Sequence, residues 1–126
     1  MPFAFWVVRM IEKVEFGRII INGKEYHHDI IIYPSGKVEK RKKWISKEKH
    51  GTSHKLDPEE LREYLKEEFE VLVVGTGIYG MLYLLSESKE LTEGKDVIEK
   101  PTPEAAKIFN KLKEKKKTLG IFHITC

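Results

Sequence analysis

The sequence predicts a single three-layer α/β domain, in which a central, mostly parallel sheet carries helices and an N-terminal antiparallel β-layer. The apolar run Val71–Val74 has the composition of a strand buried on both faces, which is typical of a helix-covered sheet. Pro58 and Pro103 stand at the expected first positions of two helices, which alternate with such strands. The hairpin signal Asn22-Gly23 lies in an earlier, β-rich part of the chain.

The β-rich part predicts three antiparallel strands. Residues 11–21 form the first strand, which ends at the Asn22-Gly23 turn. The second strand follows and includes the apolar run 30–33, and Pro34–Gly36 supplies the next turn. Residues 37–44 alternate charged residues with Val38 and predict an exposed edge strand whose lysines discourage unwanted pairing.

The second part predicts a β-α-β-α-β unit. Its predicted strands are residues 71–74, 96–99 and 119–125, and its predicted helices are residues 58–69 and 103–115. Asp57 and Thr102 are the expected N-caps. Either residues 78–85 or residues 86–94 add a further helix, whereas residues 45–56 lack a regular pattern. The right-handed crossover rule makes the three strands parallel.

The composition indicates a globular, cytoplasmic protein. The 126 residues suffice for one domain, and no apolar run approaches the ~20 residues of a membrane-spanning helix. A single cysteine, Cys126, suits a reducing compartment. Abundant Lys and Glu without Gln are typical of hyperthermophile proteins. Because Met10 opens a sensible domain by itself, we expect residues 1–9 to be an extension and residues 10–126 to be the domain.

The basic residues do not by themselves predict a nucleic-acid partner. Net charge is +3, and the basic runs are confined to residues 37–43 and 111–117. Trp44 is the single aromatic residue beside the first run, whereas a nucleic-acid surface would interleave several. A solvated, charged hairpin is the favoured interpretation of this segment.

A glycine-rich turn follows the predicted strand 71–74. Gly75, Gly77 and Gly80 have the G-x-G-x-x-G spacing of a dinucleotide-binding loop, and Glu99 lies at the offset of a ribose-binding acid. A dinucleotide fold uses two β-α-β-α-β units, however, and this chain has one. We therefore predict that the glycines permit a tight turn and close packing, and we expect no cofactor.

Histidines mark two further segments. His50 and His54 are spaced to bind a metal only on a helix, and Gly51 favours a loop, so no metal site is expected. Thr52 or Ser53 with His54 as base would suit a nucleophile, but the pattern supplies no orienting acid. A loop ordered by hydroxyl-to-backbone hydrogen bonds is the simpler interpretation.

The last segment places His123 near the carboxyl end of a parallel strand, where α/β proteins commonly bind ligands. Cys126 follows it, and a histidine neighbour is one way to activate a thiol. A hydrogen-bonded histidine and a small buried sulfur are the structural alternative. If a ligand-binding surface exists, we expect it to use the five residues Thr52, His54, Gly75, Gly77 and His123, whereas catalytic residues stay unassigned.

Several motifs, in order, resemble a known family over residues 11–126. They are Phe16-Gly17, Gly23 with Tyr26, Asp29, Tyr33-Pro34 with Gly36, Trp44, Gly51-Thr52 with His54, Leu72–Gly77 and Gly120–Cys126. The pattern resembles the adipogenesis-associated Mth-domain family, whose broad group includes a mitochondrial assembly factor for respiratory complex I. The resemblance implies one α/β domain with a packed β-layer, a soluble protein and an assembly or regulatory role.

The sequence therefore favours a non-enzymatic cytosolic protein that binds another protein. The alternative is an enzyme or a small-ligand or nucleotide binder that uses the crevice at the carboxyl ends of strands 71–74 and 119–125. A ligand at the glycine turn would favour this alternative.

Overall fold

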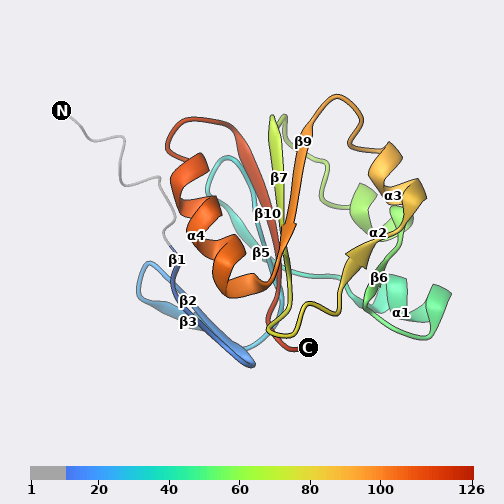
Figure 1. The fold of residues 1–126 in the computed structure, drawn as a ribbon, viewed down its shortest axis with the longest axis horizontal. Coiled ribbons are helices and arrows are strands. Elements are labelled where there is room, and N and C mark those ends of the chain that lie inside the picture. The colour runs from blue at the N-terminus through green and yellow to red at the C-terminus, as the bar shows by residue number, and fades with distance from the viewer. Residues whose placement is uncertain (1–10) are drawn as a thin grey trace.

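The computed structural model describes residues 11–126 (Figure 1). The expected extension, residues 1–9, and the expected domain start at Met10 lie outside these residues. The central sheet has five strands in the order β5-β4-β10-β7-β9. They are β4 (Ile30–Ile32), β5 (Val38–Lys40), β7 (Val71–Thr76), β9 (Asp96–Lys100) and β10 (Thr118–His123). As predicted, β7, β9 and β10 are parallel, and an antiparallel β4–β5 hairpin completes this mixed sheet.

A separate antiparallel layer is formed by β1 (Ile11–Glu15), β2 (Arg18–Ile21) and β3 (Lys24–Tyr26). Asn22 and Gly23 have φ values of 48° and 82°, as a two-residue hairpin turn with both central residues left-handed requires. The prediction of three strands in this part was wrong, because a turn at Phe16-Gly17 divides the first one. Ile30–Ile32 is buried throughout and joins the central sheet instead.

Four helices and a short strand pair complete the described chain. They are α1 (Trp44–His50), α2 (Pro58–Arg62), α3 (Ser86–Glu90) and α4 (Thr102–Leu112), with β6 (Lys55–Leu56) beside β8 (Tyr83–Leu84). The prediction of an irregular segment over 45–56 was wrong, since α1 occupies its first half. The alternative helix over 78–85 is also absent, and the helix predicted over 58–69 ends early. Asp57 caps α2 as predicted.

The core lies on both faces of the central sheet. Val71 and Val73 pack on the face covered by α4 and the β1–β3 layer, whereas Leu72 and Val74 pack on the opposite face. Figure 1 shows α4 on one side of the sheet and α1, α2 and α3 on the other. Strand β7 is buried along its whole length, which explains why its sequence is an unbroken apolar run.

Candidate functional site

The glycine turn does not open a helix. Strand β7 continues to Thr76, and the chain then turns through Gly77 towards β8. The backbone N–H groups of Tyr79 and Met81 both donate to the carbonyl oxygen of Cys126, at 3.1 Å each. The amides that a pyrophosphate would need are therefore already bonded to the chain's own last described residues, unlike those of a dinucleotide loop.

The first two glycines of the motif, Gly75 and Gly77, permit close packing. A Cβ on Gly77 would lie 2.4 Å from the carbonyl carbon of Cys126 and 2.7 Å from Cδ2 of His123, and its φ is +108°. A Cβ on Gly75 would instead lie 2.8 Å from the Thr102 hydroxyl oxygen. Gly77 thus contacts His123, whereas Gly75 packs against α4.

Thr102 is not an N-cap, because it is the first residue of α4. Its buried hydroxyl accepts a hydrogen bond from the Gly77 N–H at 2.8 Å and donates one to the His123 carbonyl. The residue that the sequence assigns to helix capping therefore connects the carboxyl ends of β7 and β10.

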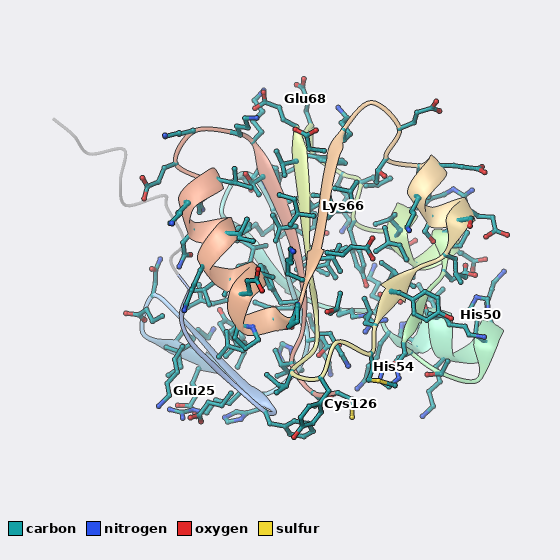
Figure 2. All side chains as sticks on the ribbon, in the orientation of Figure 1. Glu25, His50, His54, Lys66, Glu68 and Cys126 are labelled. Carbon is teal, nitrogen blue, oxygen red and sulfur yellow. The ribbon has the colours of Figure 1, made fainter. Side chains whose placement is uncertain are left out.

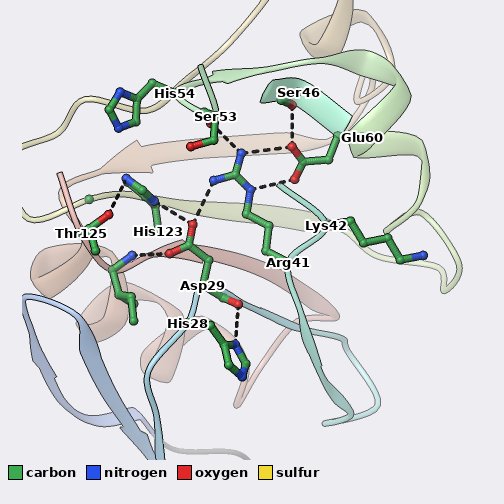
Figure 3. A network of polar contacts seen from close by, with 12 residues as sticks. His28, Asp29, Arg41, Lys42, Ser46, Ser53, His54, Glu60, His123 and Thr125 are labelled. Carbon is green, nitrogen blue, oxygen red and sulfur yellow. Dashed lines mark hydrogen bonds and ion pairs between the residues drawn. The ribbon is translucent and has the colours of Figure 1, made fainter. Parts of the chain in front are cut away.

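His54 and His123 lie together, as Figure 3 shows. Their rings meet edge to face, with centroids 5.2 Å apart. The Thr52 hydroxyl accepts a hydrogen bond from the His54 N–H at 3.1 Å and orders the loop. Partial burial lowers the pKa of His54, and the neighbouring His123 and Arg41 lower it further. Of the five residues expected at a ligand site, this arrangement brings together Thr52, His54, Gly77 and His123. Gly75 instead faces Thr102 of α4.

A buried arginine lies beneath these histidines (Figure 3). Arg41 is 3% exposed. Its guanidinium binds both carboxylate oxygens of Glu60, at 2.8 and 3.0 Å, and donates to Asp29 at 2.9 Å. It also donates to the Ser53 carbonyl at 2.7 Å and so holds the loop that carries His54. Burial opposes its charge, but the two carboxylates more than compensate and raise the pKa of Arg41.

Asp29 orients His123. Nδ1 of His123 lies 2.7 Å from one Asp29 carboxylate oxygen, and the Ile124 N–H donates to the other at 2.8 Å. Because a carboxylate only accepts, the Nδ1 proton is the donated one, and Nε2 faces the Thr125 hydroxyl at 3.4 Å. Burial would raise the pKa of Asp29, yet the hydrogen bond and charge of His123, with Arg41, hold it below its usual value.

Glu60 is fully buried and fully bonded. Besides Arg41, it accepts hydrogen bonds from the Ser46 hydroxyl at 2.5 Å and from the Tyr64 hydroxyl at 2.6 Å. Burial and this carboxylate raise the pKa of Tyr64 well above its usual range. We call Asp29, Arg41, Glu60 and His123 the buried charge network.

Sequence reasoning missed most of this network. Arg41 stands in a basic run that resembles a solvated surface, and Glu60 stands where a capping-box glutamate is expected. Asp29 had one signal, its position just before an apolar strand in the family motif. His123 was predicted as a site residue, although the acid that orients it was not assigned.

His50 does not join His54. Its Nε2 lies 2.8 Å from the Asp57 carboxylate, and Figure 2 shows it on α1, apart from His54. Within residues 11–126, no group of three His, Cys, Asp or Glu side chains is arranged to hold a metal.

Four large side chains at the carboxyl end of the sheet are exposed. We call them the aromatic surface; they are Phe16, Tyr79, Met81 and Tyr83, with exposed fractions between 46% and 71%. The rings of Phe16 and Tyr79 lie 6.1 Å apart. In Figure 1 the tip of the β1–β2 hairpin and the loop after β7 lie beside the C-terminus, and Gly17 N–H binds the Ile124 carbonyl at 2.7 Å. Aromatic and Met side chains are enriched at protein interfaces.

Three of the five basic residues in the first basic run pair with acidic side chains. Lys37 pairs with Glu39 at 3.1 Å and Lys42 with Glu63 at 2.7 Å, while Arg41 is buried. Trp44 is 58% exposed at the start of α1. None of the helices in residues 11–126 combines the length and hydrophobicity of a membrane span.

Comparison with known proteins gives a family and similar structures. Residues 11–123 match the model of a family described as "Protein of unknown function (DUF498/DUF598)". The conserved hypothetical protein PH1505 from Pyrococcus horikoshii OT3 is 66% identical, with a TM-score of 0.90 over 92% of this chain and 98% of that one. A structure named MT938 is 34% identical, with a TM-score of 0.79 over 94% and 99% of the two chains.

The fold extends to a more distant protein. A Bordetella pertussis protein described as a Mth938-like domain is 18% identical, with a TM-score of 0.60 over 94% of this chain and 87% of that one. This likeness concerns the fold alone. No functionally curated protein matches the sequence.

Proposed function

The chain belongs to the DUF498/DUF598 family of proteins of unknown function, and from this premise we propose that it is a non-enzymatic, cytosolic factor that binds another protein in assembly or regulation. The aromatic surface carries the proposal. Its side chains come from the β1–β2 turn, the loop after β7 and strand β8, so the folded domain assembles them from separate segments. Neighbouring exposed aromatic rings, such as those of Phe16 and Tyr79, are typical of protein-interaction sites.

The partner is a protein segment with a matching apolar side chain. Tyr79 is 71% exposed and stands on a loop whose backbone is fixed by the bonds to Cys126. A rigid, exposed aromatic residue loses little conformational entropy on binding, as the anchor residues of interfaces do. The resemblance to the adipogenesis-associated Mth-domain family, whose group includes a complex I assembly factor, supports a role in assembly or regulation.

Site-specific photocrosslinking tests this function. A photoreactive phenylalanine analogue at position 79 is expected to capture a distinct protein in cells of the source organism. The same analogue at Trp44, which is similarly exposed on α1, is the matched control and should not capture it. The double variant Tyr79→Arg/Met81→Arg should lose the partner while its Tm changes little, because exposed substitutions cost within about 0.5 kcal/mol.

Two results would contradict the proposal. One is capture of the same partner from positions 79 and 44 alike, which would indicate non-specific adhesion. The other is crosslinking of position 79 to a second copy of this chain alone, which sedimentation velocity would report as a dimer.

The alternative function, a small-ligand binder or enzyme, has one specific observation in its favour. His123 lies between the Asp29 carboxylate and the Thr125 hydroxyl, an order of acid, base and hydroxyl that occurs in nucleophilic catalysis. Its crevice would adjoin the carboxyl ends of β7 and β10. A burst of p-nitrophenol from p-nitrophenyl acetate that is lost in Thr125→Ala and kept in Thr52→Ala would support it. Equal rates in all three proteins would exclude it.

A further inference from the structure

A groove separates the edge strand β1 from helix α4. A cavity of about 180 Å³ lies between Ile11–Val14 of β1 and the first turns of α4, at Pro103, Ala106 and Lys107. Figure 1 shows α4 running beside the β1–β2 hairpin. An apolar cavity of about 150 Å³ is enough to bind benzene. This groove therefore has room for one aromatic side chain.

The backbone edge of β1 faces the same groove. Strand β1 pairs with β2 on one side and is the edge of its layer on the other. At Ile11 the carboxamide of Asn110 accepts from the backbone N–H and donates to the carbonyl, at 2.9 Å each. A carboxamide that donates and accepts in this way imitates the peptide group of a neighbouring strand. Strand β2 pairs with one side of β1. Within residues 11–126, no element besides β2 bonds to the backbone of residues 12–15.

One cation at the rim of the groove, Lys107, has no ion-pair partner among residues 11–126. The Glu12 carboxylate accepts a hydrogen bond from the Gly23 N–H, and Lys13 pairs with Glu15 at 3.3 Å. Lys107 is exposed and makes no ion pair within the described residues. The groove thus combines an apolar cavity, an open strand edge and an unpaired positive charge.

We propose that this groove binds an extended peptide of another protein, which pairs with the edge of β1, inserts an aromatic side chain beside Ala106 and places an acidic side chain near Lys107. In such strand addition, backbone hydrogen bonds supply affinity and the pocket supplies specificity. This site is separate from the aromatic surface and does not depend on it.

A synthetic probe tests the site on the full chain. The probe is acetyl-Asp-Val-Phe-Val-Asp-amide, and the readout is the NMR amide shifts of residues 12–15. Saturable shifts are expected, and replacement of Phe by Ala in the probe should abolish them. Lys107→Glu should weaken binding by about 1.4-fold to fivefold, the range of an exposed ion pair. Lys111→Glu, on the same helix but outside the groove, is the control and should bind as the natural chain does.

Three results would overturn the proposal. They are an absence of shifts in residues 12–15 at millimolar probe, equal binding of the Phe and Ala probes, and binding only after Phe3, Phe5 and Trp6 are all changed to Ser. The last result would mean that the chain's own first residues compete for the groove. The Tyr79→Arg/Met81→Arg variant should bind the probe normally, so the proposed function can fail while this proposal stands.

Discussion

Replacing Arg41 by Met tests the buried charge network. The methionine keeps most of the side-chain volume but leaves Asp29 and Glu60 without their shared cation. Breaking a buried ion pair from one side typically costs about 3–5 kcal/mol, because a charge stays buried without compensation. Glu60 retains its bonds from Ser46 and Tyr64, so we expect a loss near 3 kcal/mol. For a domain of this size, that corresponds to roughly 10 °C in Tm.

Urea unfolding of both proteins at pH 7 and near pH 4.5 measures this effect. In the natural chain the pKa of Asp29 is lowered, so its contribution to stability is present above its unfolded pKa and lost as the pH falls through the folded value. Without Arg41 the Asp29 carboxylate protonates more easily, because a charge that lowers its pKa is gone. The difference in unfolding free energy should therefore shrink at the lower pH.

Lys42→Met is the matched control. Lys42 stands next in sequence, but its ion pair with Glu63 is exposed to solvent and should contribute little to stability. A loss below 1 kcal/mol in Arg41→Met, or a difference that grows towards acid pH, would refute the assignment of a compensated buried charge.

Three further predictions concern the core, the glycine turn and the histidine loop. Val73→Asp should prevent folding, because an unpaired charge in the middle of the sheet costs several kcal/mol, and a soluble variant with a cooperative urea transition would disprove this. Millimolar NAD(H) or NADP(H) should leave Tm unchanged, since the loop amides are already bonded, whereas saturable micromolar binding would favour the alternative function. Because the folded pKa of His54 lies below 6.5, the natural chain should lose stability relative to His54→Gln as the pH falls from 6.5 towards that pKa. Equal losses of stability in the natural chain and in His54→Gln over this pH range would contradict the prediction.

The parallel sheet could be predicted because its burial leaves a direct pattern in the sequence. Strand β7 is covered on both faces, so every position is apolar or small, and no charged residue interrupts the run. Helix α1 left no such pattern. Only Ile45 and Ser46 are buried in it, and a single buried apolar position in seven residues gives no helical period. Thr102 has the sequence position of an N-cap. Its hydroxyl instead bonds to the Gly77 N–H and to the His123 carbonyl, at the ends of β7 and β10.

A residue of the candidate site could be predicted only where its position along a strand determined its place in the fold. His123 was identifiable because parallel strands end at one edge of the sheet. Its partner Asp29 is separated from it by 94 residues, and no local periodicity connects the two. Arg41 was interpreted as part of a solvated hairpin and Glu60 as a capping-box glutamate. Charged side chains are rarely buried unless paired, and the pairing is a property of the tertiary structure.

The buried charges also explain how the histidine loop keeps its position. An apolar core could fill the same volume, but it would not fix the loop, because hydrophobic contacts have no direction. Arg41 instead donates to the Ser53 carbonyl, and the next residue, His54, accepts from the Tyr83 N–H through its own carbonyl at 2.8 Å. A chain of directional bonds therefore runs from the network through the loop to the backbone of Tyr83, a residue of the aromatic surface. We therefore expect a change at Arg41 to disturb the backbone at Tyr83, so binding variants are best made on the exposed side chains themselves.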